Sequence, residues 1–242
     1  MDIINNKILI TGGSSGIGLA LAVNLSKLGN HVIITGRDRE KLRSIAQHHQ
    51  LSTFCCDLTR SDDLDALASA ISEEHPDLNV LINNAGVQYN YSFLHEATYQ
   101  RIDEETTTNL TAAMKLCAAF IPMFLGGKEA AIINVSSSLS FVPKRSAPVY
   151  SATKAGLHIF TKALRYQLQG SNIKVFEVIP PLVDTPMTTG RGRNKISPAD
   201  LADEFVRGWE QDRWVMNIGR VKLLKAIHRL SPYLADSLMK NN

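Results

Sequence analysis

Two hydrophobic patterns alternate along most of the chain. Short, largely apolar runs without polar alternation recur at 7–11, 31–35, 52–56, 79–82, 130–135 and 173–179. Segments with apolar residues at helical spacing lie between them, at 19–28, 38–49, 61–74, 98–124 and 150–169. Runs of the first kind are typical of strands buried on both faces of a parallel sheet, and the second pattern predicts amphipathic helices.

The alternation of strands and helices predicts an α/β fold. Successive βαβ units form right-handed crossovers, so we expect a doubly wound parallel sheet with helices on both faces. No linker, repeat or internal boundary interrupts residues 1–242, which we interpret as a single domain. After the sixth strand, Ser197 and Pro198 predict the cap and first position of a further helix, followed by an edge strand at 214–218.

Composition narrows the function classes. The chain is 44% apolar and 20% charged, as is usual for soluble globular proteins, and its net charge of +3 gives no reason to expect nucleic acid. The sequence contains no apolar run of about 18 residues, so we expect no membrane-spanning helix. The amino terminus does not resemble a signal peptide. Three cysteines, two of them adjacent, suggest a reducing cytoplasm, and no Cys/His spacing predicts a metal site.

A glycine-rich turn separates the first strand from the first helix. Gly12, Gly16 and Gly18 allow a tight turn and close approach of a pyrophosphate to the helix N-terminus. The spacing is GxxxGxG, and a glycine triplet alone is also compatible with a plain βα turn. Its position between a strand and a helix favours dinucleotide binding.

The end of the second strand bears on cofactor choice. Gly36 stands where an acid would bind an unphosphorylated ribose, and Arg37 follows, as suits a 2′-phosphate. We therefore expect NADP(H) in preference to NAD(H), although Arg37 is also compatible with a solvated loop charge and Asp38 with a ribose contact. The residues at the next two strand ends that are placed to meet the adenine and its ribose are Asp57, Leu58 and Asn83.

Tyr150 and Lys154 are the strongest candidates for proton chemistry. At i and i+4 they lie on one face of a predicted helix, one turn apart. A free phenol titrates near ~10, and a fixed ammonium, helped by an oxidised nicotinamide ring, lowers that pKa. YxxxK alone is usually ordinary helix surface, so the interpretation depends on the rest of the chain.

Together these residues resemble the short-chain dehydrogenase/reductase family, in its single-domain branch with a Rossmann-type sheet. The resemblance covers about residues 5 to 190. It is carried by Thr11-Gly12-x-x-x-Gly16-x-Gly18, Asn83-Asn84-Ala85-Gly86, Asn109, Ser136-Ser137, Tyr150-x-x-x-Lys154 and Ile179-Pro180 through Thr185. The carboxy-terminal part, with Pro180-Pro181 and residues 214–222, is similar to the DltE-like reductases associated with bacterial D-alanylation operons.

The resemblance implies an NADP(H)-dependent oxidoreductase that transfers a hydride between a nicotinamide and a small carbonyl or alcohol substrate. It assigns Tyr150 as general acid/base, Lys154 as its partner and ribose ligand, Ser137 to the substrate oxygen, and Asn109 to a water that links Lys154 to solvent. Taken alone, Asn109 is as compatible with a helix-bending amide. The expected cofactor contacts are Gly12, Ser14, Ser15, Gly16, Ile17, Gly18, Arg37, Asp57, Leu58, Asn83, Ala85, Gly86, Tyr150, Lys154, Pro180, Val183 and Thr185.

Two departures from the family pattern keep alternatives open. Pro181 replaces the usual glycine after the sixth strand, which fixes φ and removes an N–H donor near the nicotinamide, and Ser140 stands where glycine is common. Pro181 favours a non-catalytic dinucleotide-binding sensor or scaffold, whereas the complete set of candidate catalytic residues argues against one. A sugar-nucleotide epimerase is disfavoured by the GxxxGxG spacing and by the short chain after Thr185.

The last part of the chain supplies candidate surfaces. We expect a mobile substrate loop at about 184–197, where Arg191, Arg193 and Lys195 either meet an acidic substrate or are simply solvated. Apolar residues at helical spacing fill about 219–240, and Pro232 divides them into two helices with basic residues among them. Such a stripe more often packs on its own domain or a partner than on an anionic membrane. By resemblance, helices 98–124 and 150–169 form the contact of a homodimer or homotetramer.

Overall fold

A parallel β-sheet forms the centre of the computed structural model, which describes residues 1–240. Within these residues seven strands follow the order β3-β2-β1-β4-β5-β6-β7. The strands are β1 (Lys7–Ile10), β2 (His31–Gly36), β3 (Ser52–Cys55), β4 (Val80–Asn83), β5 (Ala130–Val135), β6 (Ile173–Ile179) and β7 (Val215–Asn217). From β1 the chain adds β2 and β3 on one side, and it then adds β4 on the other side of β1. The carboxyl ends of β1 and β4 therefore form the switch point where ligands bind in such sheets.

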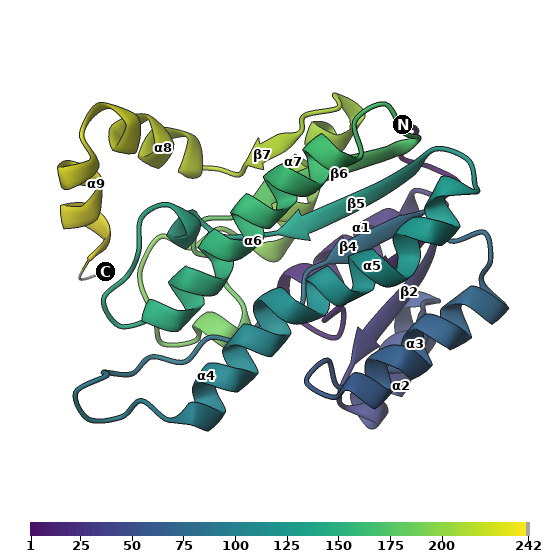
Figure 1. Cartoon of the computed structure of the whole chain (residues 1–242), viewed down its shortest axis with the longest axis horizontal. Coiled ribbons are helices and arrows are strands. Elements are labelled where there is room, and N and C mark those ends of the chain that lie inside the picture. Colours follow the sequence, from purple (N-terminus) through teal and green to yellow (C-terminus); the bar gives the residue numbers. More distant parts are fainter. Residues whose placement is uncertain (241–242) are drawn as a thin grey trace.

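Helices cover both faces of this sheet (Figure 1). One layer holds α1 (Gly16–Lys27), α2 (Arg39–His49) and α7 (Pro198–Glu210), and the other α3 (Ser61–Glu74), α5 (Ala112–Leu125) and α6 (Pro148–Gln167). In β1, Ile8 and Ile10 pack with Leu21 of α1, whereas Leu9 packs with Phe120 of α5. Both faces of the strand are therefore buried, which explains its lack of polar alternation.

Local signals in the sequence set most element boundaries. The expected strands 130–135 and 173–179 and the helix 61–74 are confirmed residue for residue. Asp38 caps α2 by accepting from the backbone N–H of Lys41 at 3.0 Å, and Ser197 caps α7 by accepting from that of Asp200 at 3.0 Å. The edge strand at 214–218 is also present, as β7 beside β6.

The long helix predicted at 98–124 is interrupted. It consists of α4 (Tyr99–Thr106), a π-helical turn (Thr107–Thr111) and α5. Asn109 lies in the π turn, accepting from the N–H of Val87 at 2.8 Å and donating to its carbonyl at 2.9 Å. These two hydrogen bonds join the helix to the segment after β4. A π-helical turn contains one more residue than an α-helical turn, and the bonds give a physical reason for it here.

The same segment is long and apolar enough, by length and composition alone, to cross a membrane. Its side chains Leu116, Phe120 and Phe124 are instead buried against the sheet of this chain. This packing is typical of a core helix.

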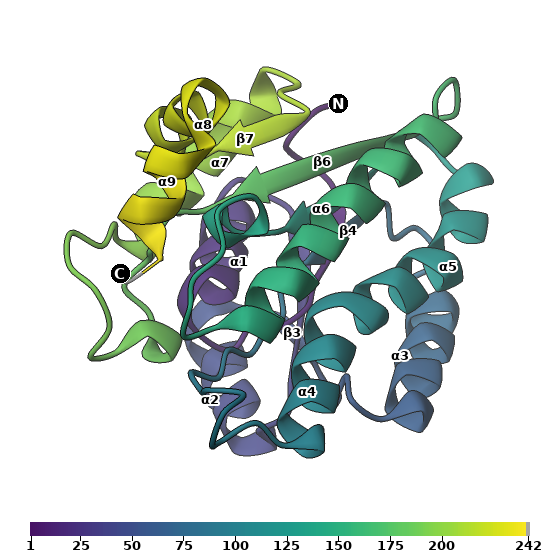
Figure 2. The same ribbon diagram turned by 60° about the vertical axis from the view of Figure 1, so that its left-hand side comes forward.

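Two helices, α8 (Val221–Leu230) and α9 (Pro232–Met239), project beyond the carboxyl ends of the strands (Figure 1). The break at Pro232 is confirmed, and Ser231 caps α9 by accepting from the N–H of Leu234. Figure 2 shows both helices close to the loop after β5, and the N–H of Arg145 donates to the carbonyl of Lys240 at 3.2 Å. The two helices therefore form a cover over the carboxyl edge of the sheet.

Candidate active site

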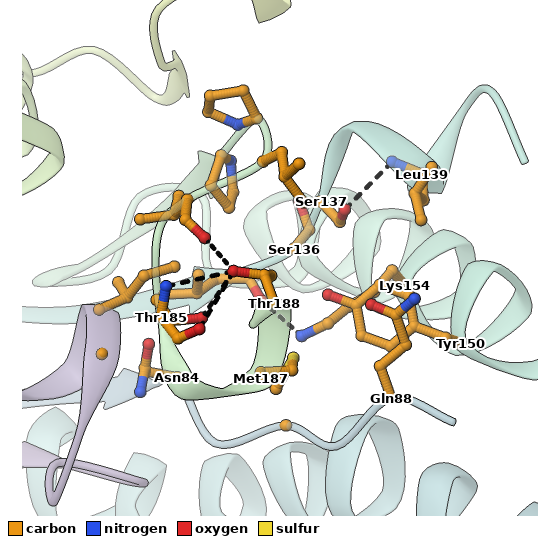
Figure 3. Close-up of a pocket in the computed structure, with 18 of the residues that line it drawn as sticks. Asn84, Gln88, Ser136, Ser137, Leu139, Tyr150, Lys154, Thr185, Met187 and Thr188 are labelled. Carbon is orange, nitrogen blue, oxygen red and sulfur yellow. Dashed lines mark hydrogen bonds between the residues drawn. The ribbon is translucent and has the colours of Figure 1, made fainter. Parts of the chain in front are cut away.

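A cavity of about 1010 Å³ opens at the carboxyl ends of the strands (Figure 3). Its walls come from the β1–α1 turn, the ends of β2 to β5, the start of α6, the segment 180–194 and the helices α8 and α9. Among the residues assigned from the sequence, those that line it are Gly12, Ser14, Ser15, Gly16, Ile17, Arg37, Asp57, Leu58, Ala85, Gly86, Ser137, Tyr150, Lys154, Pro180, Val183 and Thr185. The lining thus joins segments that are far apart in the sequence.

The glycine-rich turn forms one end of the cavity. Gly12 and Gly16 have φ values of 65° and 54°, in the left-handed region that favours glycine. A Cβ atom on Gly12 would lie 2.8 Å from the Cα of Ala85. The open backbone and the N-terminus of α1 therefore face the cavity as a cradle that fits the pyrophosphate of a dinucleotide.

Gly18 lies behind this cradle and does not line the cavity itself. A Cβ atom on Gly18 would be 2.4 Å from the carbonyl oxygen of Gly12 and 2.4 Å from Nδ2 of Asn84. That amide donates to the carbonyls of Thr11 and Gly12 at 3.0 and 3.2 Å. Asn84 therefore ties the end of β4 to the glycine turn, and Gly18 lets α1 approach both.

Arg37 and Asp57 lie at the ends of β2 and β3. Nη1 of Arg37 donates to Glu104 at 3.2 Å, and the Arg37 side chain is 58% exposed, so its guanidinium is well solvated. Asp38 is occupied as the cap of α2. Burial raises the pKa of Asp57, but hydrogen bonds from Thr59 outweigh it and hold that pKa below its ordinary value. Arg37 is therefore the cation at the end of β2 that faces the cavity.

Asn83 and Asn109 do not line the cavity. Nδ2 of Asn83 donates to Oδ1 of Asn134 at 2.9 Å, inside the sheet. Successive strand residues face opposite sides, so Asn84, not Asn83, faces the glycine turn. Asn109 lies behind Gly86, where a Cβ atom would be 3.3 Å from its Oδ1 and 3.7 Å from Nζ of Lys154. It is 1% exposed, so it is not a surface amide.

The start of α6 presents Tyr150 and Lys154 to the cavity. Nζ of Lys154 donates to the carbonyl oxygen of Val135 at 2.8 Å and lies 5.8 Å from the centroid of the Tyr150 ring. Figure 3 shows the two side chains together, with Ser137 nearby and Thr185 on the opposite side of the view. The expected pairing of phenol and ammonium is therefore present in the geometry.

The electrostatics of this pair differ from the expectation. Burial raises the pKa of Tyr150 to about 12, while a hydrogen bond from Ser137 acts in the opposite direction. The charge of Glu105 raises it further and that of Arg191 lowers it. Burial also lowers the pKa of Lys154 to about 8. The side chains of this chain thus keep the phenol protonated at neutral pH, and desolvation outweighs the effect expected of Lys154.

The serines after β5 have different partners. Ser137 hydrogen-bonds Tyr150 and accepts from the N–H of Leu139 at 3.1 Å. The hydroxyl of Ser136 instead donates to Glu177, a carboxylate on β6 that is 1% exposed and lies 2.9 Å from Nδ1 of His158. Sequence reasoning missed this buried network, because no local pattern links β6 to α6. It holds the backbone beside Ser137 in place.

Sequence reasoning also missed one end of the cavity, the end beside α8 and α9, which we call the substrate end. Residues of α8 and α9 line the cavity as an apolar wall, consisting of Leu223, Leu224, Ile227, Leu238 and Met239. Their helical spacing indicated an amphipathic stretch but not the surface that it covers. Lys144, from the loop after β5, and Arg191, from the predicted substrate loop, line the same end, as does Pro181.

Comparisons with known proteins agree with this geometry. A family model for the short chain dehydrogenases matches residues 6–196. The chain is 38% identical to an uncharacterized oxidoreductase named DltE from Bacillus subtilis, over 93% of this chain and 92% of the relative. It is 26% identical, with a TM-score of 0.81, to a short-chain dehydrogenase from Sphingobium yanoikuyae in complex with NADPH, covering 96% of each chain. A metagenomic short-chain oxidoreductase in complex with NADP is 30% identical, with a TM-score of 0.76, over 90% of this chain and 98% of that one. The resemblance seen in the motifs is therefore confirmed, and the chain belongs to the short-chain dehydrogenase/reductase family of NAD(P)-dependent oxidoreductases.

Proposed function

We propose that the protein is an NADP(H)-dependent carbonyl reductase, or an alcohol dehydrogenase in the reverse direction, with Tyr150 as the general acid/base. The observation that carries this proposal is the meeting of Ser137, Tyr150 and Lys154 in one cavity with the glycine cradle. A bound nicotinamide cofactor would supply the hydride. The carbonyl group gains that hydride and a proton from Tyr150, giving an alcohol and the oxidised cofactor.

The side chains of the site supply the proton and stabilise the developing charge. As the carbonyl oxygen becomes negative, the hydroxyls of Ser137 and Tyr150 donate hydrogen bonds to it. A phenol with a pKa of about 12 is protonated at neutral pH and is ready to donate. The reverse reaction needs the phenolate, which the ammonium of Lys154 and the hydrogen bond from Ser137 stabilise. Lys154 therefore acts in both directions through its charge.

Carbonyl reduction should fall as the pH rises through about 8. Lys154 loses its proton in this range, since burial lowers its pKa to about 8, whereas Tyr150 stays protonated. The profile of kcat/KM between pH 6 and 10 measures this. In Lys154→Arg the cation persists across this range, so the residual activity should show no decrease of kcat/KM above pH 8. A wild-type profile of kcat/KM that stays flat to pH 10 contradicts the assignment.

The same shift in the pKa of Lys154 has a consequence for stability. The unfolded lysine titrates near ~10.4, so between about pH 8 and that value the unfolded state binds more protons than the folded state. The contribution of this group to the free energy of unfolding is therefore unfavourable at neutral pH and improves as the pH rises through this window.

We propose that Arg37 selects NADP(H). Its guanidinium lines the cavity at the end of β2, while the neighbouring carboxylate of Asp38 caps α2. Ser14 lies close by, since a Cβ atom on Gly36 would be 3.0 Å from its Oγ. The similar solved structures hold NADPH or NADP in some cases and NAD or NADH in others, so the choice of NADP(H) rests on Arg37.

Arg37→Ala should raise the KM for NADPH by about 10-fold or more and change that for NADH little. A charge-assisted hydrogen bond contributes about 1.5–3 kcal/mol, reduced here because the guanidinium is exposed. Steady-state kinetics with both cofactors measures the difference. Glu104→Gln provides a matched test in the opposite direction, because it removes the carboxylate that competes with a phosphate for Arg37. Equal changes for NADPH and NADH would reject the assignment.

A panel of ketones and aldehydes with NADPH tests the proposed activity directly. Oxidation of NADPH that depends on a carbonyl substrate supports the reductase. The second candidate is a dinucleotide-binding sensor, which Pro181 in the cavity lining favours because it cannot donate a backbone hydrogen bond. Tight NADPH binding without reduction of any carbonyl in the panel would favour the sensor.

We also propose assembly as a homodimer or homotetramer through α5 and α6. Ile159 and Tyr166 on α6 are 61% and 63% exposed, and Leu125 at the end of α5 is 52% exposed. Apolar side chains gathered on neighbouring helices are typical of a contact between subunits. Light scattering of wild type and of Ile159→Lys measures the assembly, and a lysine there should dissociate it.

A further inference from the structure

Besides Arg37 and Lys154, four cations line the cavity. Arg193 and Arg220 are exposed, and the two that are partly buried are Lys144 and Arg191. Within residues 1–240, no carboxylate forms an ion pair with either side chain. Buried charges are usually paired, so the buried Nη1 atom of Arg191 calls for an explanation.

Arg191 has donor capacity that the described chain does not use. Its Nη1 atom is buried and has no hydrogen-bond partner within the described residues. Its Nη2 atom donates only a long bond of 3.4 Å to the carbonyl oxygen of Gln88. A buried charged donor without an acceptor costs about 1–3 kcal/mol or more. An acceptor that enters the cavity would remove this cost.

The backbone on both sides of Arg191 has a conformation that favours glycine. Gly190 and Gly192 flank it with φ values of 74° and 60°, both in the left-handed region. A Cβ atom on Gly192 would lie 2.3 Å from a methyl carbon of Leu182, so the backbone packs closely there. Lys195 of the same loop is instead occupied by Asp184 at 3.1 Å and by the carbonyl oxygen of Thr188 at 2.7 Å.

Both cations line the same cavity as Tyr150. Burial is the largest cause of both pKa shifts, raising that of Tyr150 and lowering that of Lys144, and the charge of Arg191 acts on both groups in the lowering direction. The backbone N–H of Lys144 donates to Oγ of Ser151, which ties the loop after β5 to the start of α6. Glu105 also acts on Tyr150, but its carboxylate already accepts from the N–H of Tyr89 and the hydroxyl of Tyr91. An anion between the two cations would relieve their repulsion.

Apolar side chains form one wall of the substrate end, although Gln88 and Asn194 also line the cavity. Leu223, Leu224 and Ile227 of α8 contribute to the apolar wall, together with Met187 of the substrate loop. The geometry points to an anionic carbonyl substrate: a ketone or aldehyde with a carboxylate or phosphate group held by Arg191 and Lys144, and an apolar remainder against α8. This inference rests on the proposed reductase activity and specifies its substrate class.

Matched ketones test the charge requirement. Wild-type enzyme with NADPH is assayed on 6-oxoheptanoate, its methyl ester and the corresponding ω-phosphonate. We expect kcat/KM to be at least about 10-fold higher for one of the two anions than for the ester, since charge-assisted hydrogen bonds contribute about 1.5–3 kcal/mol. The better of the carboxylate and the phosphonate identifies the anion. Equal use of anions and ester would overturn the inference.

Variants locate the recognition. Arg191→Gln and Lys144→Gln should each lower the ratio of kcat/KM for the preferred anion to that for the ester by about 10-fold. Arg145→Gln is the matched control, since Arg145 is exposed, adjacent to Lys144 and not part of the cavity lining. If Arg145→Gln lowers this ratio equally, the preference for the anion comes from the overall positive charge of the region and not from direct contacts with Arg191 and Lys144, and the assignment is overturned.

Calorimetry separates this inference from the proposed activity. Binding of 6-oxoheptanoate and of the phosphonate to the protein with oxidised NADP⁺, which cannot reduce a ketone, is measured for wild type and Arg191→Gln. If no carbonyl is reduced but an anion binds through Arg191, the reductase proposal fails and the anion site stands. If ketones are reduced but neither anion binds more weakly to Arg191→Gln than to wild type, the anion site fails and the reductase stands.

Discussion

Tyr150→Phe should lower kcat for carbonyl reduction by about 10³-fold. The variant removes both the proton donor and one hydrogen bond to the developing oxyanion, and general acid catalysis alone contributes about 10²–10⁴-fold. The phenyl ring still fills its place beside Lys154, whose ammonium is anchored on the carbonyl of Val135. The dissociation constant for NADPH should therefore change by no more than about twofold. Stopped-flow reduction and NADPH fluorescence measure the two quantities separately.

Another tyrosine provides the control. Tyr233 lies on α9, is 85% exposed and is not part of the cavity lining. Tyr233→Phe should retain wild-type kcat. If Tyr150→Phe keeps more than about a tenth of the wild-type rate, another group supplies the proton and the assignment of Tyr150 is lost.

Gly18→Ala should weaken NADPH binding by about 10-fold or more and destabilise the fold by about 1–3 kcal/mol. The new methyl group would lie 2.4 Å from the carbonyl oxygen of Gly12 and 2.4 Å from the amide of Asn84, so α1 has to move away from the glycine turn. That movement displaces the helix N-terminus from the anion that it would bind. Chemical denaturation and NADPH titration measure the two effects.

Gly127→Ala is the matched control for Gly18→Ala. A Cβ atom on Gly127 would make ordinary contacts, the nearest at 3.6 Å from the carbonyl oxygen of Phe124. The same added methyl group should there leave both the stability and the cofactor affinity close to wild type. Wild-type NADPH affinity in Gly18→Ala would show that the close approach of α1 does not matter for binding.

The sheet and most of its helices could be predicted because their signals are local. An apolar run without alternation indicates a buried strand, and capping residues such as Asp38 and Ser197 fix helix starts through contacts three residues away. The positions of Tyr150 and Lys154 on one helix face follow from helical geometry in the same way. None of these inferences needs knowledge of what the element packs against.

The features that were missed depend on contacts between distant segments. The π turn at Asn109 forms through bonds to Val87, 22 residues earlier in the chain. Asn83 points toward Asn134 inside the sheet and not toward the cavity. Strand residues alternate between faces, so its direction depends on where β4 ends. The raised pKa of Tyr150 reflects how completely the surrounding chain removes water from it, and a sequence pattern contains the partner Lys154 but not that degree of burial.

The apolar wall has a consequence for how substrate preference can change. Its helices α8 and α9 stand outside the two layers that sandwich the sheet, and Ala235 of α9 is among their few fully buried side chains. Replacing Leu223 or Leu224 should therefore change the shape of the cavity and leave Ser137, Tyr150 and Lys154 in place. Substitutions in α8 and α9 would thus let related reductases diverge in the carbonyl compounds they accept while the residues around Tyr150 stay the same.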